Sequence, residues 1–310
     1  MQKVKVYAPA SIGNLGPGFD VIGLAISNCG DTVEAFVRNK PGVGVLEITG
    51  DGGRLPLEPE KNAAAIAAMK VLEKTGSDIG IDLKIHKGVS FPSGLGSSAA
   101  SAVAGGFAAN ELVKNKLEKV ALLEACTEGE AAVSGGAFAD NTGASLFGGC
   151  VLTKCSEDSI RIVPLGTIPE LAIILATPMY PMPTKKSRAV LPKEVPLGKF
   201  VSNMSSTAFI VAAFLTKNIN LLEHSIEDLI IEPARKSLIP GFDDVKNAAM
   251  DHGAMGCSIS GGGSSVFAIA RNRPGIDLIG ESMKTAFMRN GLESVVHICS
   301  VDELGTRVIE

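Results

Sequence analysis

The stretch PSGLGSSAASAVAGG, residues 92–106, has the composition of a phosphate-binding turn that leads into a helix. A glycine-rich loop at a helix start directs several unpaired backbone N–H groups at one point, and the helix dipole adds partial positive charge there. Gly94 and Gly96 would let the backbone approach an anion, while Ser97 and Ser98 add hydroxyls that can cap the helix or touch a metal ion. The alternative is a tightly packed glycine and alanine helix with no ligand.

We compared this glycine-rich stretch with two known nucleotide-binding motifs. The Walker pattern G-x-x-x-x-G-K-[ST] is absent, because no lysine follows either glycine. Gly94, Gly96 and Ala99 fit the dinucleotide fingerprint G-x-G-x-x-A, which also needs an acidic residue at the end of the next strand. Glu111 and Glu118 fall in helical territory instead. A dinucleotide-binding oxidoreductase therefore stays open as an alternative.

A second candidate lies on the helix expected over about 118–133, EKVALLEACTEGEAAV. At about 100° per residue, Glu130 points almost the same way as Leu123 on the apolar stripe, whereas Glu128 points to the other side and is expected to be solvated. A carboxylate on an apolar stripe is costly unless it is paired or bound to a cation. Glu130 is therefore a candidate metal ligand, with an ion pair to a buried arginine or lysine as the alternative.

The composition favours small-molecule chemistry in a two-domain protein. The 310 residues exceed the usual single-domain size, and 35 of them are glycine, well above the average share of about 7%. A net charge of −4 without any lysine and arginine block lacks the footprint of a nucleic-acid binder. The six cysteines and four histidines show no metal-ligand spacing, and no apolar run approaches the ~20 residues that span a bilayer. We expect a cytoplasmic protein that binds neither nucleic acid nor membrane.

The hydrophobic pattern predicts mixed α and β structure along the whole chain. A helix over about 62–75 is expected to begin at Asn62 as N-cap and to stop at Gly76. A proline-dense segment, 178–198, is expected to be a loop. A boundary near residue 165 divides the chain into an N-terminal domain, 1–165, and a C-terminal domain, 166–310. Strands are expected at 3–8, where Pro9 would end the strand, and at 31–38, 44–49, 81–86 and 171–178, with further helices at about 200–216 and 280–290.

Three motifs in order resemble the GHMP kinase superfamily, the galactokinase, homoserine kinase, mevalonate kinase and phosphomevalonate kinase group. They are PASIGNLGPGFDVIGLAI, SGLGSSAASA and GCSISGGGSSVFAIA. Within that superfamily, SGGAFADNTGASLFGG, SRAVLP and EPARKSLIPGF are similar to the homoserine kinases, and the resemblance covers essentially the whole chain. It implies an α+β (mixed α/β) two-domain fold: an ATP-binding N-terminal domain with a ribosomal-protein-like βαβ core, and a ferredoxin-like C-terminal domain.

The resemblance further implies ATP-dependent phosphorylation of the side-chain hydroxyl of L-homoserine in threonine biosynthesis, assisted by Mg²⁺. Asn62 would lie near the adenosine end of ATP, and the magnesium ligands would be Ser98 and Glu130, the latter already singled out by its helix face. Another GHMP small-molecule kinase, or a silent relative that binds ATP without turnover, is the alternative. The loop residues that would wrap the ATP phosphates are Ser90, Phe91, Pro92, Ser93, Gly94, Leu95, Gly96, Ser97, Ser98, Ala99 and Ala100.

The acceptor site implied by the resemblance takes polar side chains from both halves of the chain. Asp20 could pair with the ammonium of homoserine, while Arg188 and Arg235 could hold its carboxylate. Taken singly, these arginines could be surface cations and the asparagines turn residues. The full set is Asn14, Asp20, Asn141, Thr184, Arg188 and Arg235, of which Asn14, Asn141 and Arg188 would take part in catalysis.

The resemblance implies phosphoryl transfer without a dedicated base. Many superfamily members place an aspartate near the acceptor hydroxyl, but the corresponding residue here is Asn141, which cannot accept a proton at neutral pH. Asp140 is the rival base. Two departures stand out: Phe138 occupies a position where many relatives have histidine, and Pro92 lies two residues before Gly94 rather than four. Relatives are commonly homodimers, which we also expect here.

Overall fold

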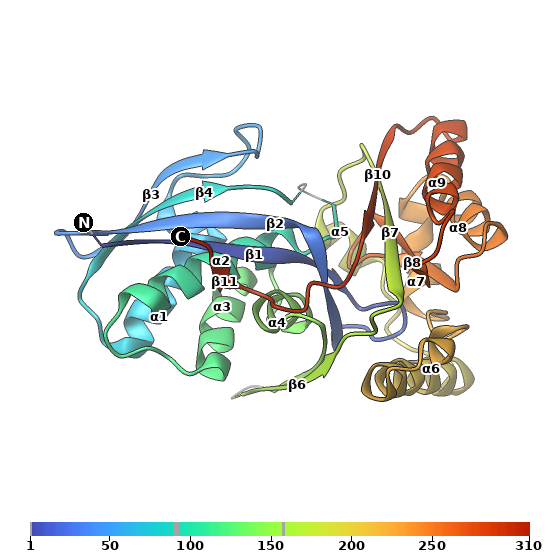
Figure 1. The fold of residues 1–310 in the computed structure, drawn as a ribbon, viewed down its shortest axis with the longest axis horizontal. Coiled ribbons are helices and arrows are strands. Elements are labelled where there is room, and N and C mark those ends of the chain that lie inside the picture. Colours follow the sequence, from blue (N-terminus) through green and yellow to red (C-terminus); the bar gives the residue numbers. More distant parts are fainter. Residues whose placement is uncertain (1, 90–92, 157–158) are drawn as a thin grey trace.

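The computed structural model describes residues 2–89, 93–156 and 159–310, and its chain forms two sheets with helices packed on them (Figure 1). The first sheet has the order β11-β1-β2-β4-β3, and β5 and β6 continue from the beginning of β2. Only β3 and β4 pair in parallel within it. A dinucleotide fingerprint belongs to a parallel βαβ unit, so this sheet argues against an oxidoreductase. The strands are β1 (Lys3–Gly13), β2 (Ile22–Arg38), β3 (Gly42–Thr49), β4 (Gly80–His86), β5 (Cys150–Cys155), β6 (Ile160–Gly166) and β11 (Arg307–Val308).

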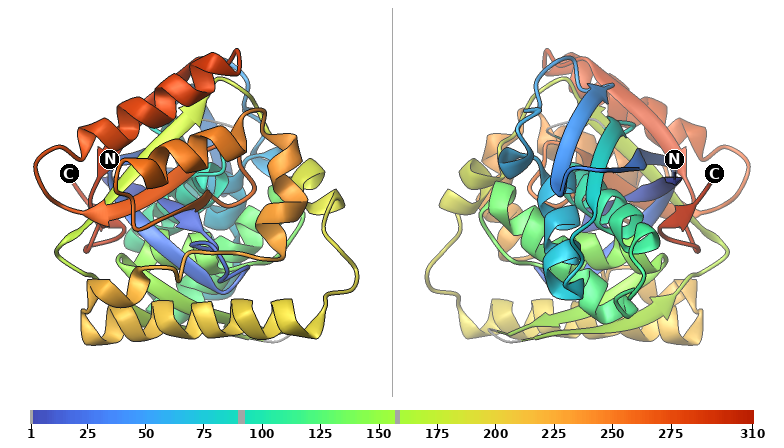
Figure 2. Two further views of the ribbon diagram at one scale, coloured as in Figure 1. Left: turned by 90° about the vertical axis from the view of Figure 1, so that its right-hand side faces the viewer. Right: turned by 90° about the vertical axis from the view of Figure 1, so that its left-hand side faces the viewer.

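One face of the first sheet is covered by four helices, with α2 in contact with both β1 and β2 (Figures 1 and 2). The glycines of this layer let the helices pack closely. A Cβ on Gly105 would lie 2.3 Å from the carbonyl oxygen of Ala64, and one on Gly106 would lie 2.6 Å from the Cys126 sulfur. The second half of the small-residue stretch therefore serves packing between helices. These helices are α1 (Ala63–Thr75), α2 (Ser97–Leu112), α3 (Lys119–Ser134) and α4 (Asp140–Phe147).

The second sheet is antiparallel, in the order β10-β7-β9-β8, with α8 and α9 packed against it. Its central strand β7 is buried along its whole length, as its unbroken apolar sequence predicts. The helix α6 (Leu197–Thr216) runs along the edge of the molecule (Figure 2). Within the described ranges, none of the helices has the length and apolar character needed to cross a membrane. The remaining elements are β7 (Leu171–Pro178), β8 (Gly256–Ile259), β9 (Val266–Arg271), β10 (Ser294–Cys299), α5 (Thr184–Ala189), α7 (Ile231–Arg235), α8 (Phe242–Asp251) and α9 (Asp277–Arg289).

The strands change sheets close to the predicted domain boundary. β6 ends at Gly166 in the first sheet, and β7 begins at Leu171 in the second. The end of the chain then returns to the first sheet, where Val301 bridges to Ile26 and β11 pairs with β1. The boundary near residue 165 stays a prediction, and the last ten residues belong structurally with the N-terminal sheet.

Local signals predicted several elements well and others poorly. Asn62 caps α1 by accepting hydrogen bonds from the N–H groups of Ala64 and Ala65, and Gly76 ends the helix with a φ of 65°, as expected. The strand expected to stop at Pro9 instead continues to Gly13, because a register shift beside the proline accommodates its missing N–H. The segment 178–198, expected to be a loop, contains the short helix α5.

Candidate functional site

The phosphate loop is the segment 88–96, of which the structure describes residues 88–89 and 93–96, and it leads into α2 at the N-cap Gly96. Gly94 and Gly96 have φ values of 79° and 63°, a conformation that favours glycine. The first helical hydrogen bond runs from the N–H of Ala100 to the carbonyl of Gly96, 2.8 Å long. The N–H groups of Ser97, Ser98 and Ala99 therefore precede the helical ladder and suit an anion. Three of the residues predicted to contact ATP, Ser90, Phe91 and Pro92, lie outside the described residues. The same holds for the unusual position of Pro92, two residues before Gly94.

The second glycine block packs directly onto the phosphate loop. Ser260 donates its hydroxyl to the carbonyl of Gly94 at 2.8 Å, and the N–H of Ser265 donates to the carbonyl of Ser93 at 2.9 Å. A Cβ on Gly94 would lie 2.4 Å from the carbonyl oxygen of Ser260, so this approach requires glycine. The block from the C-terminal half thus supports the loop from the N-terminal half, 166 residues away in sequence.

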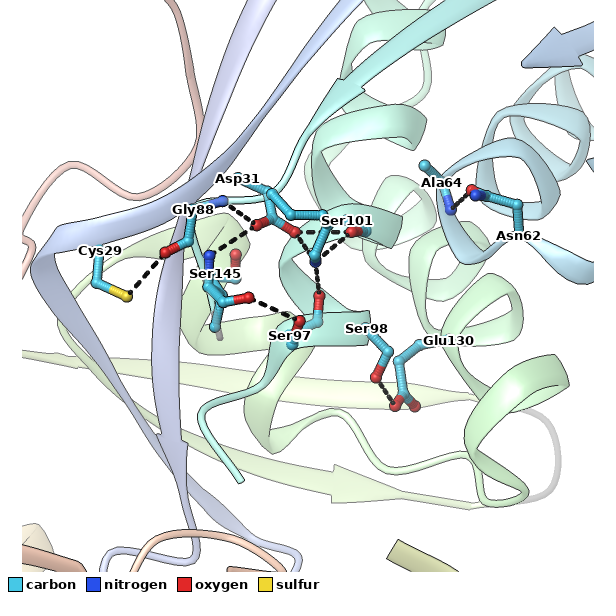
Figure 3. A network of polar contacts seen from close by, with 12 residues as sticks. Cys29, Asp31, Asn62, Ala64, Gly88, Ser97, Ser98, Ser101, Glu130 and Ser145 are labelled. Carbon is cyan, nitrogen blue, oxygen red and sulfur yellow. Dashed lines mark hydrogen bonds and ion pairs between the residues drawn. The ribbon is translucent and has the colours of Figure 1, made fainter. Parts of the chain in front are cut away.

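Ser98 and Glu130 meet at the start of α2. The Ser98 hydroxyl donates to the Glu130 carboxylate at 2.9 Å (Figure 3). Ser134, one turn further along α3, donates to the other carboxylate oxygen at 2.9 Å. Burial raises the pKa of Glu130, while the two hydroxyls and then Arg188 act in the opposite direction. Glu128, expected to be solvated, is exposed and pairs with Lys70 and Lys74. The structure therefore places Glu128 and Glu130 on different faces of α3, as the helical periodicity of the sequence predicts.

The Ser98 and Glu130 oxygens fit a magnesium ion that phosphates help to hold. Mg²⁺ in such sites takes one or two protein carboxylates and completes its shell with substrate phosphates and water. In the ranges that the structure describes, no three histidine, cysteine or acidic side chains gather as a metal site. One carboxylate and one hydroxyl beside a phosphate-binding turn are the donor set expected when the nucleotide supplies the other ligands.

Beside the loop lies a mainly apolar cavity of about 410 Å³, within the range of small-molecule sites, about 300–1,000 Å³. Asn62 lines it, but the Asn62 side chain is largely committed to the fold: its oxygen caps α1, and its amide donates to the Pro56 carbonyl at 3.2 Å. Leu95 and Ala100, two predicted ATP contacts, are only 2% and 0% exposed as whole residues, and neither lines this cavity. Their roles as ATP contacts stay predictions, since the Ser11 N–H donates to the Leu95 carbonyl and the Ala100 N–H donates to the Gly96 carbonyl.

A second, polar cavity adjoins the first and shares Ser97, Ser98, Ser134 and Thr184 with it. We call it the acceptor cavity. It gathers every side chain predicted for the acceptor, from positions up to 221 residues apart in sequence. These are Asn14, Asp20, Asn141, Thr184, Arg188 and Arg235, together with Glu130 and Asp140.

Asp20 and Arg188 form a two-pronged ion pair across the acceptor cavity. The Arg188 guanidinium donates to the two Asp20 oxygens at 2.7 and 3.1 Å. Its carbon lies 3.9 Å above the ring centre of Phe138 and 5.5 Å from that of Phe19, which favours one orientation of the plane. Phe138 occupies the position where many relatives were expected to have histidine. It lines the acceptor cavity and also stacks against the Arg188 guanidinium.

Asn14 and Arg235 are fixed by the backbone around them. Asn14, at a φ of 74°, accepts from the N–H of Asp20 and donates to the carbonyl of Gly261. Arg235, 3% exposed, donates to the carbonyls of Ser187 at 3.1 Å and Gly261 at 2.8 Å. Burial, and next Arg188, lower the pKa of Arg235 to about 10, so this side chain stays charged at neutral pH.

Asn141 and Asp140 begin α4, a helix that the sequence did not predict. Ser11 donates to the Asn141 side-chain oxygen at 2.9 Å, which leaves the amide nitrogen of Asn141 to donate elsewhere. Burial, and next the charge of Asp20, raise the pKa of Asp140 to about 7, while the backbone N–H groups of Asn141 and Asn14 act to lower it. Both residues line the acceptor cavity, so the structure keeps Asp140 as the rival base.

Sequence reasoning missed several contributors to this site. Ser134 lies four residues after Glu130 on α3, a spacing that could have identified it. Phe19 and Met182, which also line the acceptor cavity, carry no comparable signal, since apolar residues usually mark the core. Lys87 and Asp31 were missed as well, because their contact joins β2 to the residue just after β4, 56 positions away in sequence.

Comparisons with known proteins match both halves of the chain to the same group of kinases. A family model described as GHMP kinases N terminal domain matches residues 62–149, and one described as GHMP kinases C terminal matches residues 210–290. A homoserine kinase of Chloroherpeton thalassium is 38% identical over the full length of both chains. One of Arabidopsis thaliana is 40% identical over 99% of this chain and 84% of its own. The crystal structure of a homoserine kinase from Cytophaga hutchinsonii superposes with a TM-score of 0.94 at 42% identity, covering 100% of this chain and 98% of the other.

Proposed function

The chain belongs to the homoserine kinase family of the GHMP kinases, and we propose that it transfers the γ-phosphoryl group of ATP to the side-chain hydroxyl of L-homoserine. The observation that carries this proposal is the junction of the two cavities at Ser98. One cavity offers a phosphate-binding helix end with an apolar pocket beside it. The other offers carboxylate, guanidinium and amide groups that match a hydroxylated amino acid.

The nucleotide would occupy the apolar cavity, with its phosphates at the start of α2. The three N–H groups of the first turn and the helix dipole favour negative charge at that point. Ser98 and Glu130 would hold Mg²⁺, which supplies neutralisation of the charge on the β- and γ-phosphates. Glu130 is kept in place by Ser134, so its carboxylate is oriented before any ligand binds.

The acceptor would occupy the polar cavity as a zwitterion. The Asp20 and Arg188 pair presents one negative and one positive group side by side, complementary to an ammonium and a carboxylate. Arg235 adds a second guanidinium with a fixed direction. The amide nitrogen of Asn141 is then available to donate to the acceptor hydroxyl and to orient its lone pair toward the phosphate.

We further propose that no side chain serves as an obligatory base, because the loose transition state of phosphoryl transfer develops little nucleophile charge before bond formation. Asp140→Asn is therefore expected to keep kcat within about tenfold of the wild type, whereas a lost general base costs about 10²–10⁴-fold. Asn141→Ala is expected to lose more kcat than Asp140→Asn. Steady-state rates at saturating ATP and homoserine measure both. The reverse order of losses would assign the base to Asp140.

A stability measurement controls for the fold of the Asp140 variant. The pKa of Asp140 is raised to about 7 in the folded protein. The carboxyl thus stays protonated there at pH values at which an unfolded chain has already ionised it, and stability falls as the pH rises from about 4 to 7. Asparagine cannot ionise. The variant should lose this pH dependence and be at least as stable as the wild type at pH 8.

We propose that two copies associate through the outer face of α6. This helix carries no charged residue between Lys199 and Lys217, yet it exposes large apolar side chains along its length. A second copy of the chain could cover this face by antiparallel packing of two helices, a two-fold arrangement in which each presents the same surface. The exposed residues include Leu197 (76%), Phe200 (52%), Met204 (54%), Phe209 (51%) and Leu215 (61%).

Light scattering after size exclusion is expected to give twice the 32.0 kDa mass of one chain. Met204→Glu would place a charge at the middle of the face and should yield the single-chain mass with unchanged secondary structure. Leu46→Glu, at a 54% exposed position on β3, serves as the control and should remain dimeric. A wild-type protein with the mass of one chain would contradict this arrangement.

We propose a cytoplasmic location. Each of the six cysteines is a free thiol in the described part of the chain, as expected in a reducing compartment. Fractionation of cells that produce the protein should recover it with soluble cytoplasmic enzymes.

The alternatives are separated by an assay of ADP release with purified protein, ATP and Mg²⁺. L-Homoserine should support turnover, and mevalonate, galactose and shikimate should not. Turnover with one of these instead would identify another GHMP small-molecule kinase. Thermal protection by NAD(H) but not by ATP would indicate an oxidoreductase.

A further inference from the structure

A buried polar cluster lies beneath the phosphate loop and outside the acceptor cavity (Figure 3). We call it the loop-base cluster and define it as Asp31 on β2, Lys87 just after β4, and Ser101 on α2. Their exposed fractions are 0%, 5% and 6%. Burying an ion pair is costly, and a buried pair can often be replaced by apolar side chains without loss of stability. Its presence here therefore calls for a reason other than stability.

The loop-base cluster is internally complete. The Lys87 ammonium donates to the Asp31 carboxylate, to the Ser97 carbonyl at 2.9 Å and to the Ser101 hydroxyl at 2.8 Å. These three contacts use all three of its hydrogens. The Asp31 carboxylate in turn accepts from Ser101 at 2.7 Å and from the N–H groups of Gly88 and Val89 at 3.1 Å each. Lys87 and Ser101 both line the apolar cavity, yet the three ammonium hydrogens and the Ser101 hydroxyl hydrogen are already committed to protein atoms.

These contacts join the two ends of the phosphate loop. Asp31 holds the loop's first residues, Gly88 and Val89, through their N–H groups. Lys87 holds the first turn of α2, where the loop ends, through the carbonyl of Ser97. The Ser97 hydroxyl adds a direct contact to the carbonyl of Val89 at 3.4 Å. Both ends of the loop are thus attached to one buried carboxylate and one buried ammonium.

We propose that the loop-base cluster is a positioning device for the nucleotide: it sets the separation of the loop ends and so aims the first-turn N–H groups and Ser98 at the phosphates. This inference rests on the proposed function. The cluster touches neither the acceptor residues nor Glu130, so its influence should fall on the nucleotide and not on homoserine. Because the loop ends are already held in place, less conformational entropy is lost when the nucleotide binds.

Three variants test the proposal by isothermal titration of Mg²⁺ and ADP without homoserine, and by steady-state kinetics. Ser101→Ala removes one hydroxyl and should weaken ADP binding about threefold to tenfold, the effect of one hydrogen bond. Asp31→Asn keeps an acceptor for Gly88 and Val89 but removes the charge. Combined with Lys87→Met, it should weaken ADP binding at least tenfold. In all three the KM for homoserine should stay within twofold of the wild type.

A matched control exists in the other half of the chain. Lys246, Glu232 and Ser258 form a second lysine, carboxylate and serine group, in which Glu232 and Ser258 are buried and Lys246 is partly exposed, with Ser258 donating to Glu232 at 2.6 Å. Ser258→Ala should cost similar stability to Ser101→Ala, because both remove a serine hydroxyl from a buried carboxylate. It should leave ADP affinity unchanged, because the Ser258 hydroxyl contacts Glu232, whereas the contact of the second glycine block with Gly94 is made by Ser260. Thermal unfolding of both variants separates an effect on stability from an effect on binding.

Three outcomes would overturn the proposal. The first is wild-type ADP affinity in the folded Ser101→Ala variant and in the folded double variant Asp31→Asn/Lys87→Met. The second is a loss confined to the double variant, with Asp31→Asn and Ser101→Ala unaffected, which would make Lys87 a direct ligand. A loss shared equally by Ser258→Ala would make the effect structural. A wild-type protein that binds ADP but does not phosphorylate homoserine would instead refute the proposed function and leave this test in force.

Discussion

Replacement of Glu130 by glutamine is expected to lower kcat by about 10²–10³-fold, the usual cost of losing one group that stabilises transition-state charge. Glutamine can still accept from Ser98 and donate within the site, so the shape is kept while the negative charge is lost. The Mg²⁺ concentration for half-maximal activity should rise in parallel. Rates measured over a magnesium titration at saturating ATP and homoserine report both quantities.

Glu128→Gln is the matched control for this prediction. Glu128 lies two residues earlier on the same helix, but it is exposed and pairs with lysines on α1. Exposed ion pairs contribute little, about 0–1 kcal/mol, so its kcat and magnesium requirement should stay within twofold. Burial raises the pKa of Glu130, and the neutral variant should be no less stable than the wild type. Full activity of Glu130→Gln at unchanged magnesium would remove Glu130 from the metal site.

Replacement of Arg188 by methionine should raise the KM for L-homoserine by about 10²–10³-fold. Each hydrogen bond to a charged group contributes about 1.5–3 kcal/mol, and a carboxylate bound by the guanidinium fork would lose two of them. Partial exposure of the arginine keeps the expected loss toward the lower end. ADP affinity should not change, because Arg188 belongs to the acceptor cavity and not to the apolar one.

An acceptor without a carboxylate makes this prediction specific. 3-Amino-1-propanol keeps the ammonium and the hydroxyl of homoserine, so the wild type should use it poorly and Arg188→Met should use it no worse. Lys186→Met removes a positive charge from the same helix at an exposed position and should change neither acceptor. If Arg188→Met discriminates between the two acceptors as strongly as the wild type, then another group holds the carboxylate.

Much of the fold follows from local patterns. Helix α1 could be predicted to the residue at its start because Asn62 and Gly76 are strong capping signals. Helix α4 could not, since its N-cap is Ala139, without a capping side chain, and Gly143 lies in its interior. Pro9 would end most strands, and only the pairing of β1 with β2 on both sides of it reveals the shift that tolerates it.

The site residues also fall into two groups, those that a local sequence pattern predicts and those that depend on the packing of distant elements. Glu130 could be found from the periodicity of a single helix, because one amphipathic face reports where the interior lies. Asp20 and Arg188 are 168 residues apart, and only the resemblance to known kinases placed both in the acceptor site. Their ion pair with each other was not predicted. Neither approach found the contact of Phe138 with Arg188 or the loop-base cluster, which exist only once distant strands and helices are packed together.

The central claim is transfer of a phosphoryl group to one particular oxygen, and proton-coupled phosphorus NMR of the reaction mixture tests it most directly. With ATP, Mg²⁺ and L-homoserine, the product should be a phosphomonoester whose phosphorus couples to the two protons of the side-chain methylene, giving a triplet. Release of ADP should match this signal one to one. Formation of inorganic phosphate alone, or of a phosphorus signal without coupling to protons, would contradict the account.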